Sequence, residues 1–140
     1  MKLFYRQSGE GRPLIILHGL FGSSDNWYSL SKVFAARFSV FVIDQRNHGQ
    51  SPQSDDFNYG LLTEDLHDFI LEHQLEDPII LGHSMGGKAA MNFAVHYPQL
   101  LSNLIVVDMV PKAYPVHHDK ILEGLKSIPM DQLNWRTESN

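Results

Sequence analysis

The sequence predicts an α/β fold in which helices cover both faces of a doubly wound, mainly parallel sheet. Three observations lead to this prediction. Four short runs are apolar at nearly every position, as in strands that are buried on both faces of a sheet. Amphipathic segments separate the runs, giving the order β-α-β-α-β-α-β. Turn-forming or charged residues follow each run, and they therefore gather at the carboxyl edge of the sheet, where ligands bind in such folds.

The strands are predicted directly from these runs. Residues 2–8 alternate more between apolar and polar positions, which indicates an edge strand. Buried strands are expected at residues 14–17 (LIIL), 39–43 (SVFVI), 78–81 (PIIL) and 104–107 (LIVV). Because the last of these would end the sheet, the fold is expected to be incomplete on its C-terminal side. Its final strand would then present an open apolar edge that invites pairing with a second chain.

Helices are predicted between the strands, at residues 26–38, 59–75 and 85–97. Ser24 or Asp25 would cap the first helix, and Pro98 would end the third.

The character of the chain changes after Pro111, where residues 117–128 form a further amphipathic pattern. We therefore expect residues 1–111 to be the N-terminal part of an α/β core and residues 112–140 to be the start of a helical cap.

Composition excludes several classes of function. The net charge is −5 and the 11 basic residues are scattered, which argues against nucleic acid binding. Without cysteine, neither a disulfide framework nor a thiolate metal site can form. Apolar runs are far too short to span a membrane, and the first residues lack the apolar stretch of a signal peptide. We expect a cytoplasmic protein without a metal or cofactor.

The most informative motif is residues 82–87 (GHSMGG), which fits G-x-S-x-G between a buried strand and a helix. This pattern is typical of a nucleophile elbow, a sharp turn that exposes the hydroxyl of Ser84. Gly82 and Gly86 leave out Cβ atoms that would clash in such a turn. The N–H of Met85 would face a developing oxyanion, favoured by the positive end of the helix dipole.

Two further loops follow neighbouring strands. In residues 18–22 (HGLFG), Gly19 would let the backbone turn so that the N–H of Leu20 becomes the second oxyanion donor, while His18 supports the loop by hydrogen bonding. In residues 44–51 (DQRNHGQS), Asp44 and Arg46 are interpreted as structural anchors rather than reacting groups.

Together these three loops resemble those of α/β-hydrolase-fold serine esterases, most closely the small bacterial YbfF-type esterases. Residues 44–49 (DQRNHG) and Lys88 after the glycine pair carry the likeness to that group, and the resemblance runs through essentially all 140 residues. It implies Ser84 as nucleophile, Leu20 and Met85 as oxyanion donors, and hydrolysis of short-chain esters or thioesters without a cofactor.

The family orders its triad as Ser, then Asp or Glu, then His, with the His well downstream. The chain stops before such a His, and the shortfall is on the order of 100 residues. The missing half would lie on another chain, have been removed or be absent. Asp108, at the end of residues 104–107, is a candidate for the triad acid, with a later acid as the alternative. We assign none of the chain's own histidines, including His48, His117 and His118, as the base.

Rival functions use the same scaffold. One is hydrolysis of carbon–carbon bonds or a lyase reaction, which a charged pocket near Ser84 would favour. Another is a catalytically incomplete fragment or a non-catalytic binding protein, which the missing His would favour. Epoxide hydrolases and dehalogenases carry Asp where this chain has Ser84. A nucleotide-binding domain is excluded because no glycine loop matches G-x-G-x-x-G or a Walker loop.

Overall fold

The structure is a computed structural model that describes residues 1–108 and 134–139. Its strands are β1 (Tyr5–Ser8), β2 (Arg12–Leu17), β3 (Phe38–Ile43), β4 (Ile79–His83), β5 (Asn103–Asp108) and β6 (Asn134–Ser139). They form one sheet in the order β1-β3-β2-β4-β5-β6. Edge strand β1 is antiparallel to β3, and all other pairs are parallel. The predicted α/β class and mainly parallel sheet are confirmed.

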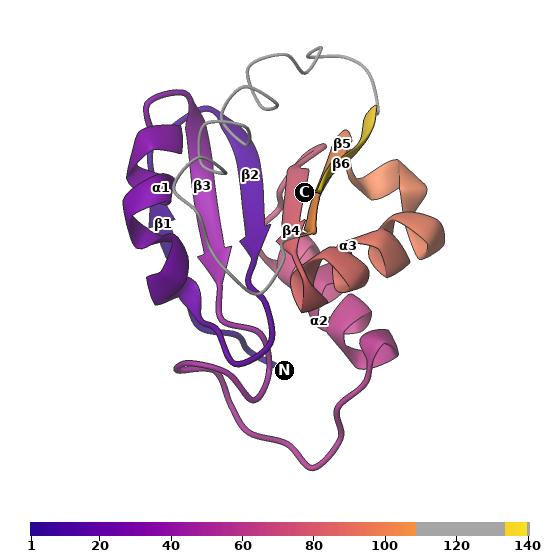
Figure 1. The fold of residues 1–140 in the computed structure, drawn as a ribbon. Coiled ribbons are helices and arrows are strands. Elements are labelled where there is room, and N and C mark those ends of the chain that lie inside the picture. Colours follow the sequence, from indigo (N-terminus) through magenta and orange to yellow (C-terminus); the bar gives the residue numbers. More distant parts are fainter. Residues whose placement is uncertain (109–133, 140) are drawn as a thin grey trace.

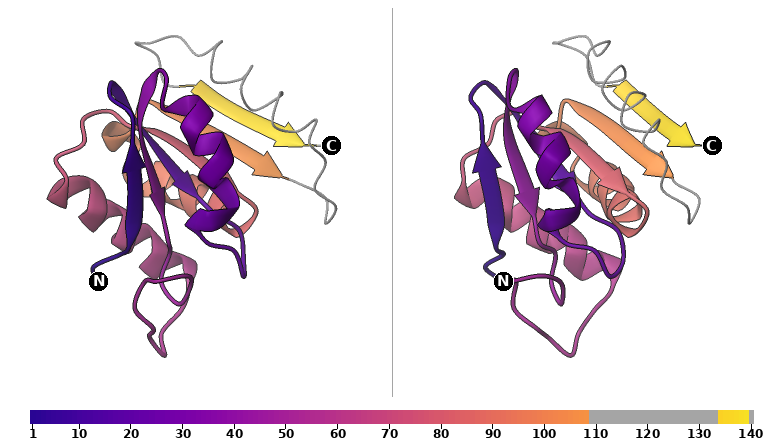
Figure 2. Two further views of the ribbon diagram at one scale, coloured as in Figure 1. Left: turned by 90° about the vertical axis from the view of Figure 1, so that its left-hand side faces the viewer. Right: turned by 60° about the vertical axis from the view of Figure 1, so that its left-hand side comes forward.

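Helices cover both faces of this sheet, as Figures 1 and 2 show. They are α1 (Tyr28–Phe34), α2 (Tyr59–Glu72) and α3 (Met85–His96), with short 3-10 helices η1 (Ser24–Trp27) and η2 (Pro98–Leu100). Helix α1 lies on one face, and α2 and α3 lie on the other.

The start of the first helical segment differs from the prediction. The N-cap is Ser23 rather than Ser24 or Asp25, because Ser23 and Asn26 form a reciprocal capping box.

The core follows the alternation of side chains along the strands. Ile15, Leu17 and Ile80 belong to one cluster, which also contains Leu66 of α2 and Phe93 of α3. The residues between them on the same strands pack on the opposite face against α1 in a second cluster, which includes Leu14, Ile16, Leu81 and Phe34. Because both faces are buried, the strands are apolar at nearly every position.

The chain winds outward from β2 in two directions. It passes from β2 to its neighbour β3, then returns to place β4 on the other side of β2 and continues to β5. The loops that leave β2 and β4 therefore lead to helices on opposite faces of the sheet (Figure 1). Such a switch in winding direction opens a crevice at the carboxyl ends of the two strands. This crevice receives residues 18–22 and 82–87.

The C-terminal end of the described chain differs from the prediction. Residues 134–139, which fall within the predicted cap at 112–140, form β6 and pair in parallel with β5. The edge of β5 is therefore covered, and the prediction that it is open is wrong. The sequence does not predict this strand because its residues are mostly polar, and a polar strand resembles a loop in sequence. The helix predicted at 117–128 lies outside the described residues.

Candidate active site

Ser84 occupies the sharp turn between β4 and α3. Its backbone has φ 55° and ψ −114°, a conformation that residues with a Cβ rarely adopt and that costs on the order of 1–3 kcal/mol. The Ser84 N–H donates to the carbonyl of Val107 in β5 (3.1 Å), and the Ser84 carbonyl accepts from the N–H of Lys88 (3.0 Å). Ser84 is exposed, whereas Met85 after it is buried. The turn therefore presents a serine side chain to solvent on a fixed backbone.

Glycines permit this turn to pack closely. A Cβ on Gly82 would overlap the carbonyl of Gly86 and lie 2.7 Å from the Cα of Gly87. A Cβ on Gly86 would overlap the carbonyl oxygen of Leu17 and lie 2.6 Å from that of His18. The first turn of α3 thus rests directly on the end of β2, which brings the two loops of the crevice together.

The loop after β2 lies against Ser84. A Cβ on Gly19 would stand 3.3 Å from the Cβ of Ser84. The Gly22 N–H donates to the Gly19 carbonyl (3.0 Å), closing a turn in which Leu20 and Phe21 are exposed. Within residues 1–108, neither the N–H of Leu20 nor that of Met85 donates to a protein acceptor. Met85 follows Ser84 in the chain, and Leu20 follows Gly19, which lies against Ser84. Within the described part of the chain, the N–H groups of these two predicted oxyanion donors are therefore not used in protein hydrogen bonds.

His18 is fully buried and bonded at both ring nitrogens. Its Nε2 accepts from the N–H of Gln45 (3.0 Å), so Nδ1 carries the proton and donates to the carbonyl of Gly19 (2.7 Å). Burial lowers the pKa of His18 below its ordinary value of 6.5, with a smaller contribution from His48, while the bond to Gly19 acts in the opposite direction. His18 is thus neutral near pH 7 and is not free to act as a base.

Residues 44–51 form an anchored loop. The carboxylate of Asp44 accepts from the N–H of Ser24 (2.6 Å) and from that of Gln50 (2.9 Å). Arg46 forms a two-pronged ion pair with Asp65 of α2, with N–O distances of 2.7 and 3.0 Å, and this bonding raises the pKa of Arg46. The interpretation of Asp44 and Arg46 as structural anchors is confirmed. Arg46 is thereby occupied and is no substrate-binding cation.

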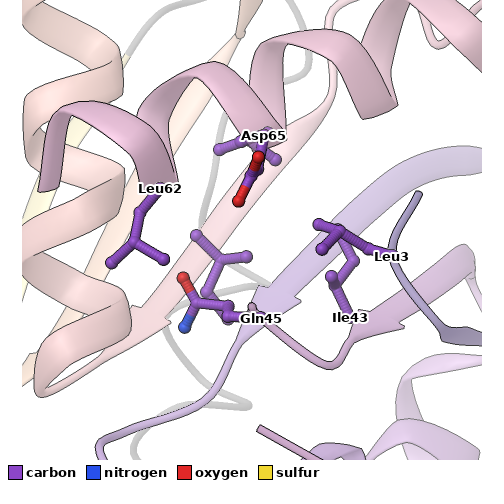
Figure 3. Close-up of a pocket in the computed structure, with 7 residues that line it drawn as sticks. Leu3, Ile43, Gln45, Leu62 and Asp65 are labelled. Atoms are coloured by element: carbon purple, nitrogen blue, oxygen red, sulfur yellow. The ribbon is translucent and has the colours of Figure 1, made fainter. Parts of the chain in front are cut away.

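Beside these loops lies an open depression of about 480 Å³. It is lined by Leu20, Phe21, Gly22, Asn47, His48, Gly49 and Phe57. His48 is held by a 2.9 Å contact between its Nδ1 and the carbonyl of Arg46. By contrast, the cavity beneath α2 in Figure 3, near Gln45 and Asp65, measures about 10 Å³, which is room for roughly one water molecule. Of these two spaces, the depression is the one that is large enough for part of a substrate, and it adjoins the loop after β2.

Asp108 is the last residue of β5, one position beyond Val107, whose carbonyl binds the Ser84 N–H. Its backbone therefore ends at the same edge of the sheet as Ser84, while its side chain is outside the described part. His117 and His118 also lie outside the described residues. Among the residues that are described, no group of three His, Asp or Glu side chains could hold a metal ion.

Gln45 and Phe57 belong to this site without being marked by a motif in the sequence. Gln45 is the more informative of the two. It follows Asp44 at the end of β3, and its side chain donates to the carbonyl of His18 (2.9 Å). Its position after a buried strand was the available signal. Its neighbours Asp44 and Arg46 are charged and therefore stand out more clearly in the sequence than Gln45 does.

Comparison with known proteins agrees with this arrangement. The family model described as the alpha/beta hydrolase fold matches residues 12–133. The chain belongs to the α/β-hydrolase family. Among solved structures of the family, a marine microorganism esterase superposes with a TM-score of 0.76 at 50% identity, covering 91% of this chain and 52% of that one. Family membership also accounts for the elbow between β4 and α3.

Two α/β-hydrolase relatives with similar sequences are an esterase and a lipase. The esterase YbfF of Escherichia coli is 32% identical over 128 residues, covering 91% of this chain and 50% of its own. The sn-1-specific diacylglycerol lipase ABHD11 of Danio rerio is 41% identical over 111 residues, covering 78% of this chain and 35% of its own. The chain thus spans half or less of the length of these relatives. The identity to YbfF confirms the predicted relationship to YbfF-type esterases. Helices long and apolar enough to cross a membrane are absent from the described part.

Proposed function

We propose that the chain carries the nucleophile and oxyanion hole of a serine hydrolase that cleaves carboxylic esters or thioesters through an acyl-enzyme on Ser84. The observation that carries this proposal is the exposed Ser84 at positive φ with the glycine loop of β2 against it. A strained residue that the surrounding packing holds in place is characteristic of functional sites. The esterase and lipase names of the relatives support the reaction class.

In the first step, the Ser84 Oγ attacks the carbonyl carbon of the ester and gives its proton to a base. The oxyanion of the tetrahedral intermediate accepts hydrogen bonds from the N–H groups of Leu20 and Met85. The carbon–oxygen bond to the alcohol then breaks, and the alcohol takes the proton from the base. Water attacks the acyl-enzyme by the same route and releases the acid. No cofactor takes part in these steps.

The base is a His outside the described residues, contributed by this protein or by a second chain. Asp108 is proposed to orient that His, because β5 delivers its backbone to the edge where Ser84 lies. A carboxylate hydrogen-bonded to the imidazole stabilises the cation that forms when the His takes the proton. His18 is unsuitable as the base because both of its ring nitrogens are already bonded.

The substrate is proposed to be a small ester with an apolar acyl or alcohol group. The open depression begins at Leu20 and includes Phe21 and Phe57, all three of them exposed. Aromatic and aliphatic side chains around an open space favour an apolar portion of a ligand. The cap predicted at residues 112–140 stays a prediction, because residues 109–133 lie outside the described part of the chain.

The proposal is tested by measuring the rate at which the protein and its Ser84→Ala variant hydrolyse p-nitrophenyl acetate, butyrate and octanoate. We expect the wild type to release p-nitrophenol and Ser84→Ala to lower kcat at least about a thousandfold. Thermal unfolding of both proteins checks that the variant is folded. A folded wild type that hydrolyses none of the esters would favour a binding protein, and equal rates for the two proteins would assign the activity to another group.

A further inference from the structure

Gln45 makes two hydrogen bonds to a single residue of the neighbouring strand end. Its backbone N–H donates to the Nε2 of His18 (3.0 Å), and its side-chain Nε2 donates to the carbonyl of His18 (2.9 Å). Gln45 and His18 are only 3% and 0% exposed, so water does not compete for these bonds. We propose that Gln45 is a positioning residue that holds the Leu20 N–H in the direction required for the oxyanion. This inference rests on the proposed function, because it concerns the same oxyanion hole.

The connection to Leu20 passes through one peptide plane. The carbonyl of Gly19 accepts two hydrogen bonds, from the Nδ1 of His18 (2.7 Å) and from the N–H of Gly22 (3.0 Å). The Gly19 carbonyl and the Leu20 N–H belong to the same planar trans peptide and point in opposite directions. Two donors on the carbonyl oxygen therefore fix the direction of the N–H, which no acceptor among residues 1–108 occupies on the other side.

Gln45 affects the carbonyl of Gly19 by determining which nitrogen of the His18 ring carries the proton. Because the backbone N–H of Gln45 occupies Nε2, the proton of the neutral imidazole must reside on Nδ1, where it reaches Gly19. The side-chain amide of Gln45 holds the His18 backbone at the same time, so that ring and peptide are fixed together. A side chain without N–H donors would leave a buried carbonyl of His18 without this partner.

The Gln45 backbone is itself anchored to α2. The next residue, Arg46, forms the two-pronged ion pair with Asp65 and also donates to the carbonyl of Asp56 (3.0 Å). Figure 3 shows Gln45 facing the small cavity beneath α2, near Leu62 and Asp65. Methionine has nearly the length and volume of glutamine, so that Gln45→Met removes the amide without overfilling this space.

The experiment compares Gln45→Met with the matched control Gln53→Met, which changes an exposed glutamine nearby on the chain. Loss of one oxyanion donor lowers rates about 10²–10³-fold, and a donor that is only loosened should cost less. We expect Gln45→Met to lower kcat for p-nitrophenyl butyrate about 10- to 100-fold with KM changed less than twofold. Gln53→Met should match the wild type. A folded Gln45→Met protein with the kcat of wild type would overturn the proposal.

Imidazole ¹⁵N NMR of the wild type provides a second test, which needs neither an active nor a folded variant. We expect His18 to be neutral with its proton on Nδ1 between pH 6.5 and 8. A proton on Nε2, or an imidazolium in this range, would refute the proposal even if Gln45→Met failed to fold. If the wild type were folded but hydrolysed no ester, the proposed function and the positioning role of Gln45 would both fail. The proton on Nδ1 would then show only that the bonds to His18 exist.

Discussion

Ser84 combines an exposed side chain with a backbone conformation that glycine adopts far more readily than serine. The conformation persists because hydrogen bonds on both sides of the residue hold it, to Val107 and from Lys88. His18 shows the complementary case at the same scale, a titratable side chain whose buried bonds keep it in one protonation state. Ser84 lowers the free energy of unfolding through its strained backbone, and His18 lowers it in mild acid.

The strain at Ser84 predicts that Ser84→Gly is more stable than Ser84→Ala. Both variants lack the hydroxyl, but only alanine keeps the Cβ that disfavours φ 55°. Relief of about 1–3 kcal/mol of strain should exceed the extra backbone entropy that glycine loses, roughly 0.5–1 kcal/mol. We expect Ser84→Gly to have the larger free energy of unfolding in urea, by about 1 kcal/mol. Equal stabilities would contradict a strained elbow.

The lowered pKa of His18 predicts that stability decreases in mild acid. Below its ordinary pKa of 6.5 the unfolded chain binds a proton that native His18 resists, so the free energy of unfolding falls as pH falls, by at most about 1.4 kcal/mol per unit. The decrease should stop below the native pKa. Urea titrations at several pH values should show this pH-dependent decrease in the free energy of unfolding in the wild type and in the exposed control His96→Gln. The decrease should be absent from His18→Asn. The same slope in His18→Asn would refute the assignment.

At the scale of elements, the position of α3 decides the geometry of the site. The first turn of this helix contacts the end of β2 at Gly86. Ser84 lies between the end of β4 and the first residue of α3. Sequence could predict these elements because a buried strand, a glycine-flanked serine and a helical pattern follow one another without interruption. The bonds between loops could not be predicted in this way. The partners Gln45 and His18 are 27 residues apart, and no periodicity relates them.

The close contact at Gly86 predicts that Gly86→Ala is severely destabilising. The new Cβ would meet two backbone carbonyls, of Leu17 and His18, and backbone atoms cannot move aside cheaply. We expect a loss of several kcal/mol in the free energy of unfolding, or no folded protein at all. The control Gly60→Ala adds the same methyl group at an exposed position in α2, where its neighbour is the side-chain oxygen of Asn58 at 3.2 Å. It should change stability by less than about 1 kcal/mol.

At the scale of the whole molecule, the winding order places the loops after β2 and β4 at one crevice. The class of fold and the position of this crevice were predictable because buried parallel strands have a distinctive composition. Strand β6 was not, since its residues are mostly polar and only pairing with β5 makes them a strand. The sequence likewise indicated Ser84, Leu20 and Met85 by their motifs, while the base was predicted to lie outside the chain.

Covalent labelling measures whether Ser84 is an activated nucleophile. The protein is treated with a fluorophosphonate probe, digested and mapped by mass spectrometry, with Ser84→Ala as the control. We expect one adduct, on the peptide that contains Ser84, and no adduct on the variant. A folded wild type that is not labelled, or equal labelling of the wild type and Ser84→Ala, would show that Ser84 is not an activated nucleophile.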